Sequence, residues 1–94
     1  MNMEKEEIGK IKRRIKKLQK EIAEVGPVMR GTVVVIGTRN KQPYFSLNKD
    51  KKTHLIYLGK RKEMMAREYS DNYRKLLDII EEMTVLNMTL LKNS

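Results

Sequence analysis

The basic side chains of this chain concentrate in its middle third, where they could neutralise an anionic ligand. Residues 26–62 carry nine Lys or Arg residues and one acidic residue, Asp50, so this segment holds +8 of the total formal charge of +9. Nucleic-acid binding requires ammonium and guanidinium groups that contact phosphate oxygens. The sequence therefore predicts nucleic acid as the partner. The expected phosphate contacts are Arg39, Lys41, Lys49, Lys51, Lys52, Lys60, Arg61 and Lys62.

Three side chains inside the basic segment could contact bases as well as phosphates. In the stretch YFSLN, residues 44–48, Tyr44, Ser46 and Asn48 alternate with two apolar residues. Alternate residues of a strand point to the same face, so these three would share one face. Hydroxyl and amide groups bond to base edges, and a tyrosine ring stacks on a base. Double-stranded DNA is the expected ligand, and the choice between DNA and RNA stays open.

The same charges have a second interpretation, which stays open at this point. Lysines in turns and edge strands increase solubility and prevent unwanted strand pairing. In that case the protein is a protein-interaction adaptor or an oligomerisation module, and its working surface lies on its helices.

Other residue types argue against catalysis and against metal or cofactor binding. The chain has no cysteine and a single histidine, His54, which removes disulfides, thiol nucleophiles and cysteine-based zinc sites. Paired carboxylates in a catalytic arrangement, a glycine-rich phosphate loop and a nucleophile beside a base are not recognisable. We therefore expect a non-enzymatic protein without a metal ion or a cofactor.

The first segment, residues 1–25, is predicted to be a long helix. Its large apolar residues recur at intervals of 3 and 4 and form a narrow seam, which is typical of a coiled coil. These residues are Ile8, Ile11, Ile15, Leu18 and Ile22. Gly26 and Pro27 end the helix, because glycine suits the position after the last turn and proline cannot continue the helix.

The basic segment, residues 28–60, is predicted to be a three-stranded antiparallel meander. The stretches RGTVVVIGT (30–38), YFSLN (44–48) and THLIYL (53–58) are rich in β-branched and aromatic residues, and turn-forming residues separate them. Three strands are about the minimum for an independent sheet.

A second long helix is predicted over residues 61–92. Its apolar seam again follows intervals of 3 and 4, and includes Ile80, Met83, Asn87 and Leu90. Asn87 would either fix the register of a helix pair with its buried amide or lie in a frayed C-terminal turn. The triplet SDN at 70–72 could break this helix in two, with Asp71 as a new N-cap.

The chain is therefore expected to form a single α+β domain over residues 1–94. Its two long helices pair as an antiparallel coiled-coil stalk, in which the acidic residues Asp78, Glu81 and Glu82 face the basic stretch 10–17. Because so short a chain buries little apolar surface, a homodimer is expected. The residues assigned to its interface are Ile8, Ile11, Ile15, Leu18, Ile22, Ile80, Met83, Asn87 and Leu90. Whether the stalk forms within one chain or between two chains is left open.

A cytoplasmic location without membrane association is expected. The longest apolar run, residues 33–36, is far too short to cross a bilayer. The stretch MNMEKEEIGK also lacks the apolar core of a signal peptide.

Five ordered motifs resemble a family of small uncharacterised prokaryotic proteins known only as a domain of unknown function. The motifs are RGTV (30–33), PYFSL (43–47), KKTHLIYL (51–58), NYRKLLDIIEEM (72–83) and LN (86–87). Many members of this family carry a cysteine-rich insertion between the first two motifs, whereas this chain has VVIGTRNKQ there, without a cysteine. The resemblance implies an accessory or regulatory protein of a mobile element, in this chain without a metal role.

A second and looser resemblance concerns DNA readers with a three-stranded sheet. The stretch HLIYLGKRKEMMAREYS (54–70) is similar to the end of the sheet and the helix start in integrase arm-binding domains and in the plant AP2-type fold. In those folds the sheet enters the major groove and the helix packs behind it. This chain departs from them in having no tryptophan on the second strand and a much longer helix.

Overall fold

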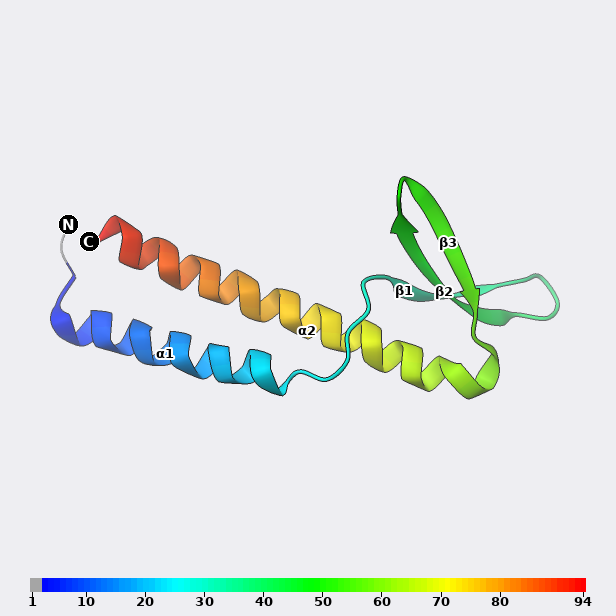
Figure 1. Ribbon diagram of the computed structural model, residues 1–94, viewed down its shortest axis with the longest axis horizontal. Coiled ribbons are helices and arrows are strands. Elements are labelled where there is room, and N and C mark those ends of the chain that lie inside the picture. The colour runs from blue at the N-terminus through cyan, green and yellow to red at the C-terminus, as the bar shows by residue number, and fades with distance from the viewer. Residues whose placement is uncertain (1–2) are drawn as a thin grey trace. The chain divides into compact units, whose positions relative to one another are not determined.

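A computed structural model of the chain describes residues 3–94 and shows a helix, a three-stranded sheet and a second helix (Figure 1). The elements are α1 (Lys5–Glu24), β1 (Thr32–Ile36), β2 (Gln42–Lys49), β3 (Lys52–Tyr57) and α2 (Gly59–Lys92). This order confirms the predicted α+β fold, with each element within a few residues of its predicted bounds. Residues 1 and 2 of the predicted first helical segment lie outside the described residues. Within residues 3–94 there is no helix both long enough and apolar enough to span a membrane.

The chain divides into two compact units. One, called here the helical unit, consists of the segment up to Val25 together with Lys75–Ser94. The other, called here the sheet unit, is Gly26–Arg74. Helix α2 belongs to both, because its first half lies in the sheet unit and its second half lies in the helical unit.

In the helical unit, α1 and the second half of α2 run antiparallel. The Arg14 side chain donates two hydrogen bonds to the Glu82 carboxylate, at 2.5 and 2.9 Å. Nearer the chain ends, Ile8 and Leu90 line one common cavity. Among the described residues of this unit, Leu18 and Ile79 are the buried apolar residues. The predicted antiparallel stalk is therefore confirmed within a single chain, and so is an ion pair between the basic stretch and Glu82.

The seam that α2 turns toward α1 differs in register from the predicted one. Its buried or half-buried apolar residues are Leu76, Ile79, Met83, Leu86 and Leu90. Ile80 and Asn87, which were assigned to the seam, are exposed in this chain. Both sets follow intervals of 3 and 4, and the observed set places leucine, rather than an amide, in the buried positions.

Helix α2 is continuous through residues 70–72, so the long helix predicted here is confirmed and the possible break with Asp71 as an N-cap does not occur. Polar residues at these positions bond to the linker between α1 and β1 instead. Ser70 donates its hydroxyl hydrogen to the carbonyl oxygen of Gly31 at 2.9 Å, and the Asn72 amide donates to that of Pro27 at 2.9 Å. The backbone N–H of Met29 donates to the carbonyl oxygen of Tyr69 at 3.2 Å. Three hydrogen bonds thus attach the linker to one face of α2.

The three strands form an antiparallel sheet in the order β1-β2-β3. A tight turn joins β2 to β3, and both of its residues, Asp50 and Lys51, have positive φ angles of 55° and 64°. Such a turn matches the right-handed twist of the two strands that it connects. The sheet packs one face on α2 through a small core of Phe45, Leu58 and Ala66.

We predict that Ser70→Ala lowers the free energy of unfolding by about 1–2 kcal/mol. The side chain is only 3% exposed, and its removal leaves the Gly31 carbonyl without this hydrogen bond. Urea denaturation at a fixed protein concentration measures the change. Glu68→Ala, an exposed neighbour in the same turn of α2, controls for the higher helix propensity of alanine. Equal stabilities of the two variants would contradict the role given to the Ser70 hydroxyl.

A second prediction concerns the ion pair of the helical unit. Hydrogen bonds from Arg14 lower the pKa of the Glu82 carboxyl below its ordinary value of 4.5. A carboxyl whose pKa is lower in the folded state stabilises the fold above its unfolded pKa, and this stabilisation is lost as the pH falls through the folded pKa. Wild type should therefore be more stable than Glu82→Gln at neutral pH, and the difference should shrink below pH 4.5.

Urea denaturation of both proteins across this pH range measures the difference. Glu81→Gln, which changes an exposed neighbouring carboxylate, is the control. A stability gap for Glu82→Gln that persists unchanged to acid pH would contradict an electrostatic role for Glu82.

Candidate nucleic-acid interface

One face of the sheet is left uncovered by the other elements of the sheet unit. Phe45 and Pro43 of β2 are buried on the side of α2, so their neighbours along the strand point to the opposite side. We call this opposite side the open face. The strand register places ten residues on it: Thr32, Val34, Ile36, Gln42, Tyr44, Ser46, Asn48, Thr53, Leu55 and Tyr57. The predicted common face of Tyr44, Ser46 and Asn48 is therefore present.

The two ends of the open face differ in chemistry. Toward the β2–β3 turn, Asn48 is paired with Thr53, and Ser46 lies between Thr32 and Leu55. This end presents hydroxyl and amide groups. Toward the other end the face carries aromatic rings, since Tyr44 and Tyr57 meet edge to face with their ring centroids 5.5 Å apart. The Tyr57 hydroxyl donates to the Gln42 amide oxygen at 3.2 Å.

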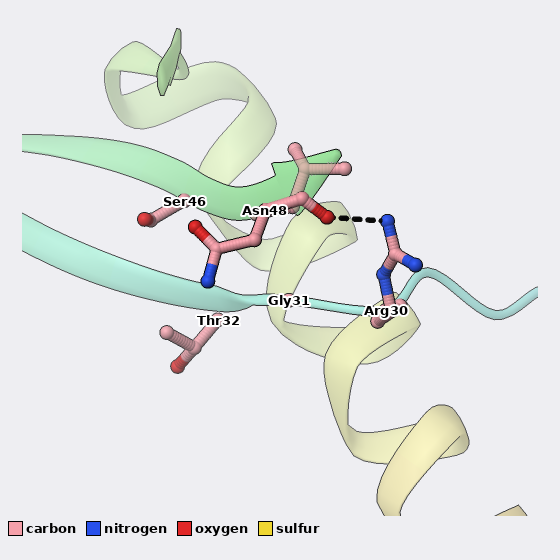
Figure 2. A pocket seen from close by; sticks show the side chains of 6 residues that line it. Arg30, Gly31, Thr32, Ser46 and Asn48 are labelled. Carbon is pink, nitrogen blue, oxygen red and sulfur yellow. Dashed lines mark hydrogen bonds between the residues drawn. The ribbon is translucent and has the colours of Figure 1, made fainter. Parts of the chain in front are cut away.

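A shallow depression of about 460 Å³ lies at the polar end of the open face (Figure 2). Its lining consists of Arg30, Gly31, Thr32, Ser46, Leu47 and Asn48, and contains no acidic residue. The guanidinium of Arg30 donates to the backbone carbonyl oxygen of Asn48 at 2.6 Å, which holds it at the rim. A guanidinium has five N–H donors, so further donors remain for a ligand.

The Asn48 side chain is oriented by a neighbour on β3. Its amide oxygen accepts a hydrogen bond from the Thr53 hydroxyl at 2.9 Å. The amide NH₂ group is thereby turned away from Thr53 and keeps its two donors for a ligand. With the Arg30 guanidinium and the hydroxyls of Thr32 and Ser46, it forms a group of donors suited to phosphate oxygens or to the acceptors on base edges.

Gly31 permits the close approach of β1 and β2 beside this depression. Its φ angle is +130°, in the region that side-chain-bearing residues rarely adopt. A Cβ atom at this position would lie 2.7 Å from both the Ser46 carbonyl oxygen and the Phe45 ring. Glycine is therefore the residue that keeps Arg30 and Thr32 next to Ser46 and Asn48.

The predicted phosphate contacts lie at both ends of the strands. Arg39 and Lys41 are in the connection between β1 and β2. At the opposite end, the turn between β2 and β3 carries Lys49, Lys51 and Lys52. All five side chains are exposed, and Asp50 is the acidic residue among them.

The third predicted group, residues 60–62, forms the first turn of α2 directly after β3. Because the Leu58 N–H donates to the Pro43 carbonyl oxygen, this turn begins at the sheet end that also carries Lys41. Lys60, Arg61 and Lys62 are all exposed, and Lys62 also lines a small apolar cavity beside Phe45 and Leu58. Basic residues thus lie at both ends of the strands that form the open face. The strand register turns Lys49 and Lys52 to the α2 side, and Lys62 also borders the core.

The sequence prediction omitted several polar residues of this site, among them Arg30 at the rim of the depression and Thr32, Thr53 and Tyr57 on the open face. Arg30 lies opposite Asn48, and Thr32 opposite Ser46. The exposed turn after Gly37 sets this hairpin register, and only the register reveals which residues oppose each other. Among residues 3–94, His, Asp and Glu side chains form no group of three or more that could hold a metal ion.

Comparison of the chain with protein-family models, with curated proteins and with solved structures gave no match. The two resemblances stated from the sequence motifs therefore stay predictions.

We predict that Gly31→Ala and Gly9→Ala change stability in opposite directions. Alanine at position 31 meets backbone at a positive φ angle, so the free energy of unfolding should fall by more than about 1 kcal/mol. Gly9 lies inside α1, where a Cβ meets only the flexible end of Arg13, so alanine should add about 0.5–1 kcal/mol. Urea denaturation measures both changes. A Gly31→Ala protein as stable as wild type would contradict the constraint described here.

Proposed function

We propose that the chain is a non-enzymatic nucleic-acid-binding protein that binds double-stranded DNA through the open face of its sheet. The observation that carries this proposal is a face rich in hydrogen-bond donors, formed by strands with basic residues at both of their ends. Within residues 26–62, nine Lys or Arg residues accompany a single acidic residue. That excess is more than solubility alone requires, and its residues lie at the two ends of the strands and in the first turn of α2.

The size of the sheet fits the major groove of DNA. Three strands separated by about 4.8 Å span about 10 Å between the outer strand axes. The major groove of B-DNA is about 12 Å wide and admits β-structure. With the strands lying along the groove, the donors of Ser46, Asn48 and Thr32 face the base edges, and Tyr44 offers an aromatic surface to a base or a thymine methyl group.

The basic residues supply affinity rather than sequence recognition. In this arrangement Arg39 and Lys41 contact phosphates at one end of the sheet, and Lys49, Lys51 and Lys52 contact phosphates at the other. Each neutralised phosphate releases counterions, so affinity falls steeply as salt increases. Arg30, at the rim of the depression, can join the Asn48 amide on one phosphate or one guanine edge.

The charges of the helical unit are consistent with phosphate contacts made mainly by the sheet unit. Residues 1–25 carry eight basic and five acidic residues, and Arg14 is already paired with Glu82. The net positive charge therefore belongs mainly to the sheet unit. A role in the cytoplasm as an accessory or regulatory protein of a mobile element belongs to the same proposal and rests on the motif resemblance alone. A transposase or integrase gene next to this gene would support it.

An adaptor function is the second candidate, and the apolar residues of the open face favour it. Leu55 and Tyr57 are about half exposed, and Ile36 lies on the same face. Exposed apolar side chains grouped on one surface often mark a protein-binding site. Charge reversal separates the two candidates, because an apolar protein interface would survive the loss of the surrounding lysines.

We predict that reversing Lys51, Lys52, Lys60 and Arg61 to Glu abolishes DNA binding. Fluorescence anisotropy with a labelled duplex at low salt measures the affinity of wild type and variant. The matched control reverses Lys10, Lys16, Lys17 and Lys20 on α1, which lowers the formal charge by the same amount. The control should bind within about tenfold of wild type, whereas the sheet variant should lose at least a hundredfold.

Two outcomes would contradict the proposal. One is the absence of binding to DNA or RNA by the wild-type protein at low salt. The other is an equal loss of affinity in both variants, because binding would then depend on total charge and not on the sheet. Survival of biological activity in the sheet variant would favour the adaptor.

A further inference from the structure

Helix α2 carries a second apolar stripe, on the side turned away from α1. Its four large apolar residues are Leu77, Ile80, Met88 and Leu91, and Thr84 lies among them. These five residues are spaced 3, 4, 4 and 3 apart, which keeps them on one side of a helix. The side chains are exposed by 44% at Leu77, 46% at Ile80, 47% at Met88 and 76% at Leu91. We call these five residues the outer stripe.

Neither helix of the chain covers the outer stripe. Toward α1, α2 presents the buried seam that contains Ile79. The seam residues of α1, from Ile8 to Ile22, are all buried or half-buried, so α1 has no second apolar face to offer. Single exposed apolar residues are ordinary on protein surfaces, whereas an aligned row over four turns of helix calls for a partner.

The outer stripe is symmetric about Thr84. Leu77 and Leu91 lie seven residues before and after it, and Ile80 and Met88 lie four residues before and after it. A two-fold symmetric interface requires that a surface match itself when the helix is reversed. A stripe with this symmetry fits an antiparallel copy of itself, with Leu77 against Leu91 of the copy and Ile80 against its Met88.

Thr84 at the centre of the stripe is compatible with burial. Its hydroxyl donates to the carbonyl oxygen of Ile80 in the same helix at 2.7 Å. The side chain thus satisfies its donor within its own helix and can present its methyl group to a partner. A polar residue at the centre therefore does not oppose the pairing.

The charges beside the stripe select the antiparallel direction. Asp78 and Lys92 are exposed on the same flank of α2. In the antiparallel arrangement about Thr84, Asp78 of one copy lies near Lys92 of the other. In a parallel pair the two-fold axis would run along the helices, so these two flanks would lie on opposite sides of the pair and Asp78 of one copy would not meet Lys92 of the other.

We propose that a second copy of this chain covers the outer stripe, so that two α2 helices pair antiparallel about a two-fold axis at Thr84. This interface differs from the one expected from the sequence, since of the residues assigned there only Ile80 belongs to the stripe, and Asn87 lies at its edge. It is independent of DNA binding, so each idea can fail without the other.

The absence of cysteine from the sequence allows a direct test by single-cysteine cross-linking. A short bis-maleimide linker joins two thiols only where they lie close together. Thr84→Cys chains should cross-link to each other. Leu77→Cys and Leu91→Cys chains should each fail to cross-link alone, and an equal mixture of the two should cross-link. Val85→Cys, a similarly exposed position away from the stripe, is the control and should cross-link poorly.

Sedimentation of the unmodified wild-type protein, without nucleic acid, completes the test. Wild type should have twice the 11.1 kDa mass of the chain, and Leu77→Lys with Leu91→Lys should reduce it to the single-chain mass without loss of helical circular dichroism. Asp78→Lys alone should weaken the dimer, and adding Lys92→Asp should restore it. A monomeric wild type would overturn the proposal, and self-cross-linking of Leu91→Cys would overturn the antiparallel arrangement.

Discussion

The packing of Phe45 on the first half of α2 determines which face of the sheet is covered and which is left open. The ring is fully buried with Leu58 and Ala66, and this contact turns one face of the sheet inward. Since side chains alternate along a strand, the same contact turns Tyr44, Ser46 and Asn48 outward. The chain has no further element in the sheet unit to cover that face. The proposed DNA-binding surface is thus a consequence of a small core packed on one side only.

Helix α2 has three separate structural roles along its length. Its first half covers the sheet, its polar residues Ser70 and Asn72 bond to the linker, and its second half pairs with α1. The outer stripe around Thr84 would add a fourth role, the pairing of two chains. A helix of 34 residues can do this because each role uses a different side or a different stretch. The polar residues within it are explained by the partners that they bond and not by a break.

Periodicity and composition were enough to predict the elements and their order, because intervals of 3 and 4, alternation and turn residues are local signals. The triplet at 70–72 shows the limit, since Ser70 and Asn72 favour a helix end in isolation and their hydrogen-bond partners at Gly31 and Pro27 are distant in sequence. The register predicted for the α2 seam was wrong for a related reason. The apolar residues of α2 cover a broad face, and two overlapping sets of them follow intervals of 3 and 4. The common face of Tyr44, Ser46 and Asn48 followed from alternation alone, whereas Arg30 joined the site only through the hairpin register.

The most direct test of the account compares two asparagine side chains as DNA is added. In a titration of isotopically labelled protein with a short duplex, followed by NMR, the side-chain NH₂ signals of Asn48 and Asn87 report on the open face and on the exposed side of α2. The account predicts that the Asn48 signal shifts, together with the backbone amides of Thr32 and Ser46, while the Asn87 signal stays in place. Shifts confined to the helical unit, or no shift at saturating DNA, would contradict it.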